Sequence, residues 1–108
     1  MTIKFPIYYQ GQMYSFAQTL NILELIINLI KQIFNTHINR YKVAISVLKT
    51  MKDIIKFNIQ DYKPKKEEIK ITIDVIKEIQ IYNVPNETQK RDIEDFAKYL
   101  KFLIEIYY

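Results

Sequence analysis

Residues 16–55 read FAQTLNILELIINLIKQIFNTHINRYKVAISVLKTMKDII, and neither glycine nor proline interrupts them. Apolar side chains recur there in alternating steps of four and three residues, which is the spacing of one face of an α-helix. One compatible structure is a single helix of about 60 Å, which would imply a coiled-coil oligomer. The other is a pair of helices that break at residues 35–39, NTHIN, where polar side chains interrupt the apolar pattern. We favour the break, because average helices in globular proteins are far shorter than about 40 residues.

The flanking sequence predicts the other elements of a mainly α-helical bundle. Residues 1–14 are expected to form an extended arm or a β-hairpin with its turn at Gln10 and Gly11. Residues 69–76 alternate like a strand but also fit a helix that starts near Pro64. We favour the helix, because a central strand would have no obvious partner except the N-terminal arm. The expected helices are 15–35, 40–57, 65–82 and 87–107.

Composition indicates one all-α domain that covers residues 1–108. A chain of 108 residues has the usual size of a single domain, and 49% hydrophobic with 26% charged residues is a globular balance. One glycine and three prolines are too few for the many turns of a sandwich or barrel. A small bundle of about four helices fits better.

The residue types that familiar catalytic and metal sites require are scarce. The chain has no cysteine and one histidine, His37, so thiolate nucleophiles, disulfides and zinc sites are not expected. A single glycine excludes glycine-rich phosphate loops. Paired carboxylates such as Glu67 and Glu68 fall in first turns of expected helices, where the helix dipole favours them. We therefore expect no catalytic, cofactor-binding or metal-binding residues, no small-molecule substrate and no enzymatic activity.

No membrane-spanning or secretory segment is recognised. The most apolar stretch, residues 20–33, contains two charged side chains, Glu24 and Lys31, and is too short to span a bilayer. The first residues lack the basic, apolar and small-residue order of a signal peptide. The lack of cysteine suits a reducing compartment. We expect a soluble cytoplasmic protein without membrane association.

Positive charge is concentrated in the middle of the chain. From residue 40 to residue 66, eight basic residues face Asp53 and Asp61, which leaves a local net charge of +6. Several of the lysines fall within about 80° of arc on the expected second helix, opposite its apolar face. Such a stripe could follow a phosphate backbone without reading base sequence, although the solvated face of an ordinary amphipathic helix looks the same. The candidate nucleic-acid- or anion-binding residues are Lys42, Lys49, Lys52, Lys56, Lys63, Lys65 and Lys66.

A second apolar stripe on the last expected helix consists of Tyr99, Phe102 and Ile106. Stripes of this kind on a terminal helix commonly contact another subunit, so we predict a homodimer with these residues in its interface. The leading functional hypothesis is therefore a non-enzymatic accessory protein that acts by protein–protein binding as a helical homodimer. The alternative is a nonspecific nucleic-acid-binding protein that uses the lysine stripe.

In composition the chain resembles the small orphan proteins encoded by viruses of hyperthermophilic archaea, which are short, cysteine-free and rich in isoleucine, lysine and tyrosine. AT-rich bacteria, phages and plasmids have similar usage. The resemblance covers the whole chain and rests on no motif. It implies an accessory protein that binds a host or viral macromolecule in the host cytoplasm, and it assigns no functional residue.

Overall fold

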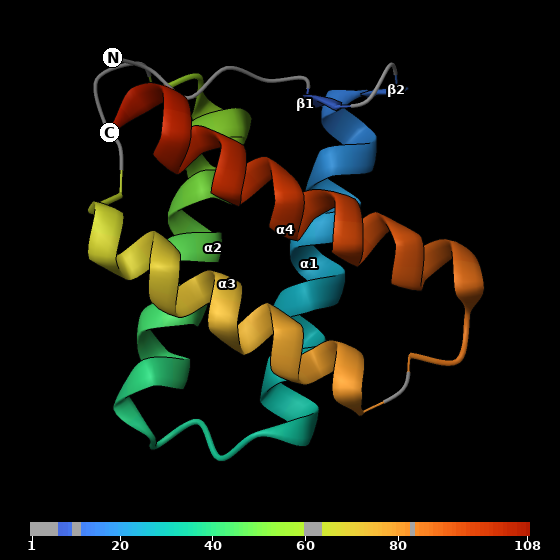
Figure 1. Ribbon diagram of the computed structural model, residues 1–108, viewed down its shortest axis with the longest axis vertical. Coiled ribbons are helices and arrows are strands. Elements are labelled where there is room, and N and C mark those ends of the chain that lie inside the picture. Colours follow the sequence, from blue (N-terminus) through green and yellow to red (C-terminus); the bar gives the residue numbers. More distant parts are fainter. Residues whose placement is uncertain (1–6, 10–11, 60–63, 83) are drawn as a thin grey trace.

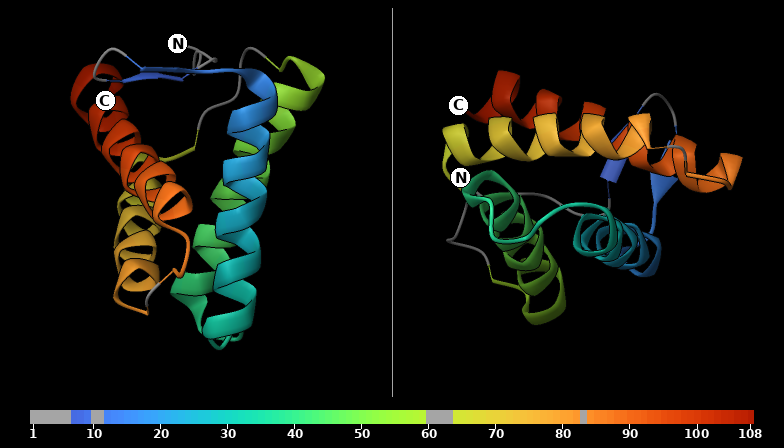
Figure 2. Two further views of the ribbon diagram at one scale, coloured as in Figure 1. Left: turned by 90° about the vertical axis from the view of Figure 1, so that its right-hand side faces the viewer. Right: turned by 90° about the horizontal axis from the view of Figure 1, so that it is seen from below.

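The computed structural model describes residues 7–9, 12–59, 64–82 and 84–108. Helices α1 and α2 form one layer, and helices α3 and α4 form a second layer packed against it (Figures 1 and 2). The predicted mainly α-helical architecture with four helices is confirmed. The helices are α1 Phe16–Ile33, α2 Asn39–Phe57, α3 Lys66–Ile81 and α4 Glu87–Tyr107.

A hydrophobic core fills the space between the two layers. Two buried threonines lie with it, and each is satisfied locally: the hydroxyls of Thr19 and Thr72 donate to the backbone carbonyls four residues earlier, at 2.9 and 2.8 Å. The core is therefore apolar apart from groups that already have partners. Its largest fully buried side chains come from all four helices and include Leu23, Ile26, Ile30, Leu48, Met51, Ile69, Ile76, Ile79, Phe96 and Leu100.

The long apolar ladder breaks between α1 and α2, as the polar residues at 35–39 predict. Phe34 has an extended backbone, with φ −105° and ψ 153°. The side chain of Asn35 accepts the backbone N–H of His37 at 3.0 Å, and its carbonyl accepts that of Ile38 at 3.1 Å. Such local bonds compete with helix continuation. The protein is accordingly 33 Å in its longest dimension, not the about 60 Å of one continuous helix.

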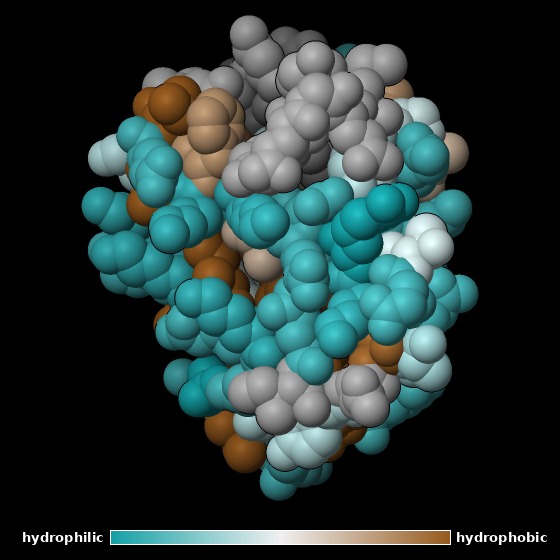
Figure 3. Space-filling view, turned by 45° about the vertical axis from the view of Figure 1, so that its right-hand side comes forward, coloured by the Kyte–Doolittle hydropathy of each residue, from teal (hydrophilic) through white to brown (hydrophobic). Residues whose placement is uncertain are grey.

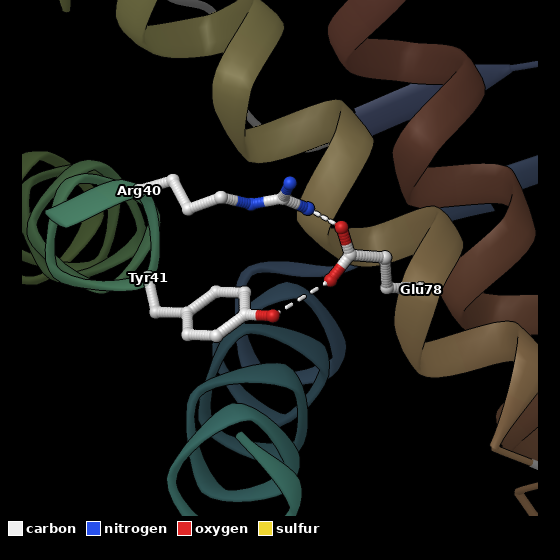
Figure 4. A network of polar contacts seen from close by, with 3 residues as sticks. All are labelled: Arg40, Tyr41 and Glu78. Atoms are coloured by element: carbon white, nitrogen blue, oxygen red, sulfur yellow. Dashed lines mark hydrogen bonds and ion pairs between the residues drawn. The ribbon is translucent and has the colours of Figure 1, made fainter. Parts of the chain in front are cut away.

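A network of polar contacts joins the start of α2 to α3 (Figure 4), and aromatic contacts lie beside it. The hydroxyl of Tyr41 donates to the carboxylate of Glu78 at 3.1 Å, and Arg40 forms an ion pair with the same carboxylate. The ring of Phe34 packs against the rings of Tyr41 and Tyr82, with centroids 4.5 and 5.4 Å away. Because these side chains come from both layers, they fix how the layers meet at this end of the molecule.

Residues 69–76 are helical, which confirms the favoured interpretation of this ambiguous segment. In α3 the side chains of Ile69, Ile73 and Ile76 are buried at helical spacing, and Thr72 and Val75 beside them are buried too. The buried surface is wide because α3 packs against α1, α2 and α4. An apolar surface this wide makes a short helical segment look like a strand in sequence.

Two short strands, β1 Ile7–Tyr9 and β2 Gln12–Tyr14, pair antiparallel with Ile7 opposite Tyr14. Strand β1 contacts α4 and strand β2 contacts α1, so the pair lies across one end of the two layers (Figure 2). The turn expected at Gln10 and Gly11 lies outside the described residues, so the hairpin stays a prediction.

Candidate anion-binding groove

The outer face of α2 carries a row of exposed lysines. Lys42, Lys49 and Lys56 are seven residues apart, so successive lysines are about 10.5 Å apart along the helix axis. The opposite face of α2 supplies Ala44, Leu48 and other side chains to the core. Packing of that apolar face therefore turns these three predicted lysines towards solvent.

A shallow, open groove of about 680 Å³ lies beside this row, and we call it the lysine groove. Lys31 reaches it from α1 and Thr36 from the α1–α2 turn, whereas the other lining residues come from α2. Three lysines and one aspartate give it a local net charge of +2. The lysine groove is lined by Lys31, Thr36, Lys42, Ile45, Ser46, Lys49, Thr50 and Asp53.

The lining offers the kinds of donors that bind an oxyanion. Three ammonium groups provide positive charge, and the hydroxyls of Thr36, Ser46 and Thr50 can donate hydrogen bonds to phosphate oxygens. Asp53 lies four residues after Lys49 and partly offsets its charge. Because the groove is open and not enclosed, it suits a long anionic chain better than a small buried ligand.

Lys52 does not belong to the open row, which corrects the sequence-based prediction. Its ammonium group pairs with Glu24 of α1, and its side chain is only 27% exposed. Hydrogen bonding and charge attraction from Lys52, with a smaller contribution from Lys56, lower the pKa of the Glu24 carboxyl. Lys52 therefore links α1 to α2, because α1 packs against the flank of α2 on which Lys52 lies.

Among the described residues, three further predicted lysines do not line the groove. Lys56 is exposed near the end of α2, and Lys65 and Lys66 lie at the start of α3. Lys66 is half-buried, whereas Lys65 is exposed. Lys63 lies outside the described residues. Of the predicted stripe, Lys42 and Lys49 line the groove. Lys31 of α1 and Thr36 of the α1–α2 turn lie there with them.

Sequence reasoning missed five lining residues of the lysine groove that carry polar groups. Ser46 and Asp53 follow Lys42 and Lys49 at helical spacing, so the pattern that identified the lysines could also have identified them. Thr50 follows Ser46 at the same spacing, whereas Lys31 and Thr36 could not be found that way, because their place depends on how α1 and the turn pack against α2. The missed residues are Lys31, Thr36, Ser46, Thr50 and Asp53.

The predicted interface on the last helix needs a correction at Tyr99. This side chain is only 4% exposed, and its ring lies 6.1 Å from that of Phe96 within the same chain. It is buried because α4 packs against α3, α1 and β1, which makes its internal face wider than the sequence indicated. Phe102 and Ile106 are 42% and 56% exposed, so both stay available to another molecule.

A polar cluster joins the N-terminal strand β2 to α4. The hydroxyl of buried Tyr14 donates to Asp95 at 2.6 Å and lies 3.4 Å from a carboxylate oxygen of Asp92. Burial and the two carboxylates raise the pKa of Tyr14 above its ordinary value. The cluster thus fastens β2 to α4. Within the described ranges, no group of three or more His, Cys, Asp or Glu side chains is arranged to hold a metal ion.

Comparison of the chain with protein-family models, curated proteins and solved structures found no match. In the described part of the chain, no helix combines the length and the apolar character needed to cross a membrane. The fold defines a small four-helix protein with a cationic groove on one layer.

Proposed function

We propose that this protein acts without catalysis by binding the phosphate backbone of a nucleic acid in the lysine groove. The observation that carries the proposal is that Lys31 of α1 joins Lys42 and Lys49 of α2 in one open hollow, together with three hydroxyl groups. Lysines on one amphipathic helix are common on any protein surface. Convergence of lysines from two helices with hydrogen-bond donors between them is a stronger reason to expect an anionic partner.

The composition of the groove favours a duplex over a single strand. Proteins that bind single strands stack the unpaired bases on aromatic side chains, and among the described residues that line the lysine groove none is aromatic. Arginine, which binds guanine edges and phosphates with two hydrogen bonds, does not occur among these described lining residues either. We therefore propose contact with the backbone of double-stranded nucleic acid, without recognition of base sequence.

The experiment is a titration of a fluorescent duplex, followed by anisotropy at several salt concentrations. Each lysine that neutralises a phosphate releases counterions, so the logarithm of the binding constant should fall linearly with the logarithm of the salt concentration. Three groove lysines give an expected slope of about −3. The double variant Lys42→Glu with Lys49→Glu should bind at least tenfold more weakly.

A matched control separates a groove from general positive charge. Lys70 and Lys77 are exposed on α3, in the other layer, and Lys70→Glu with Lys77→Glu changes the net charge by the same amount. This control should keep most of the affinity. Equal losses of affinity in both double variants would show that binding depends on net charge alone and not on the groove. Lack of binding by the wild type at low salt would refute the proposal.

Protein binding as a homodimer is the second candidate function. It is favoured by Phe102 and Ile106, which are exposed on adjacent turns of α4 although both are apolar. An accessory role, as in the viral proteins that the composition resembles, is compatible with either kind of binding. The two candidates use different layers of the molecule, so they can be tested separately.

A further inference from the structure

We infer that the outer face of α4 binds a second copy of this chain, with the two α4 helices antiparallel and Phe102 beside the two-fold axis. This inference rests on the second candidate function, protein binding, and is independent of the lysine groove. It names the partner and the pairing residues, which now include Lys98 and Glu105 in place of buried Tyr99.

The relevant side chains share one exposed stripe of α4. Lys98, Phe102 and Glu105 lie within about 60° of arc at about 100° per residue, and all three are exposed. Ile106 continues the stripe on one side and is 56% exposed. Among the residues that the structure describes, the ion pairs involve neither Lys98 nor Glu105. Both charges are thus available to a partner.

This stripe is complementary to itself in one orientation. Lys98 lies four residues before Phe102, and Glu105 lies three residues after it. When two such helices meet antiparallel at Phe102, Lys98 of each copy lies opposite Glu105 of the other. Two-fold symmetry makes the contact twice, so two ion pairs flank a central pair of Phe102 rings. A parallel pairing would instead oppose like charges, which disfavours it.

The face in Figure 3, which turns the front and right-hand side of Figure 1 to the viewer, is mainly hydrophilic, and its hydrophobic side chains form small separate patches. Phe102 and Ile106 would supply the apolar centre, and Lys98 with Glu105 would set the orientation. Figure 2 shows that α1 and α2 lie in a different layer from α4. Because residues of α1, α2 and the turn between them line the lysine groove, this pairing leaves the groove open in each copy.

The test is analytical ultracentrifugation of the full chain over a wide concentration range at low salt. The wild type should shift from monomer to dimer as concentration rises. Lys98→Glu makes the stripe acidic and Glu105→Lys makes it basic, so each variant alone should lose at least tenfold in dimer affinity. An equimolar mixture of the two variants should form a heterodimer, because every like-charge contact becomes an opposite-charge contact.

A charge change on another helix serves as the control. Lys70→Glu changes an exposed charge on α3 by the same amount and should dimerise like the wild type. If the wild type stays monomeric at every concentration, both this inference and the protein-binding candidate fail. If the wild type dimerises but the charge variants dimerise equally well, or their mixture shows no recovery, the inference fails while protein binding stands.

Discussion

At the scale of single residues, the hydroxyl of Tyr14 is the contact that most directly joins the N-terminal strands to the helical layers. The side chain is 4% exposed, and its hydroxyl donates to the carboxylate of Asp95 at 2.6 Å. A hydrogen bond to a charged acceptor contributes more than a neutral one, and leaving such a donor unpaired in the interior is costly. Tyr14 therefore stabilises the packing of β2 against α4.

Removal of this hydroxyl should weaken the fold in a pH-dependent way. Tyr14→Phe should lower the free energy of unfolding by about 1.5–3 kcal/mol near neutral pH. The pKa of Tyr14 is raised in the folded state, so the stabilisation is complete below the unfolded pKa of about 10 and is lost as pH rises further. In urea unfolding, the advantage of the wild type should shrink above about pH 10. A constant difference from pH 7 to pH 11 would contradict this assignment.

A comparison of two lysines of α2, Lys49 and Lys52, provides a second residue-scale prediction. Lys49 is exposed in the lysine groove, whereas Lys52 is paired with Glu24. Lys49→Ala should reduce the magnitude of the salt slope for duplex binding by about 1. Lys52→Ala should leave that slope nearly unchanged. An equal effect of the two substitutions would show that the Glu24 contact does not remove Lys52 from the binding surface.

At the scale of secondary-structure elements, α1 begins with a reciprocal cap. The hydroxyl of Ser15 accepts the backbone N–H of Gln18 at 3.2 Å, and the side-chain oxygen of Gln18 accepts the backbone N–H of Ser15 at 2.8 Å. These bonds satisfy two backbone donors that a helix start leaves unpaired. The cap sets the point at which the chain leaves β2 and enters the core.

A substitution at this cap should cost a moderate amount of stability. Ser15→Ala should lower the free energy of unfolding by about 1 kcal/mol, because the alanine side chain cannot accept the Gln18 N–H. Ser15→Asp should keep most of the stability, since aspartate is an equally good capping residue. Thermal unfolding followed by circular dichroism measures both. Equal losses in the two variants would show that the cap does not act through its side-chain acceptor.

Element by element, the sequence was informative wherever local interactions decide the outcome. Ser15, Asn35 and Asn86 act on backbone groups within three residues of themselves, so the start of α1, the break between α1 and α2 and the start of α4 could be predicted to within two residues. Tyr99 and Lys52 were misassigned because their surroundings depend on which helix packs beside them. Helical periodicity shows which residues share a face, but not whether a neighbouring helix covers it.

At the scale of the whole molecule, the two layers present different chemistry. The α1–α2 layer carries the lysine groove. In the other layer, α4 carries exposed Phe102 between Lys98 and Glu105. Because the surfaces lie on separate layers, pairing of α4 helices would give a particle with two free grooves. A duplex long enough to reach both grooves should then bind more tightly than a short one through avidity.

The most direct test of the account is to map duplex binding residue by residue with ¹⁵N-labelled protein by nuclear magnetic resonance. Addition of duplex at low salt should shift the amide signals of Lys31, Thr36, Lys42, Ser46, Lys49 and Thr50, and added salt should reverse the shifts. Shifts confined to the outer faces of α3 and α4, or no shifts at all at low salt, would contradict a phosphate-binding groove between α1 and α2.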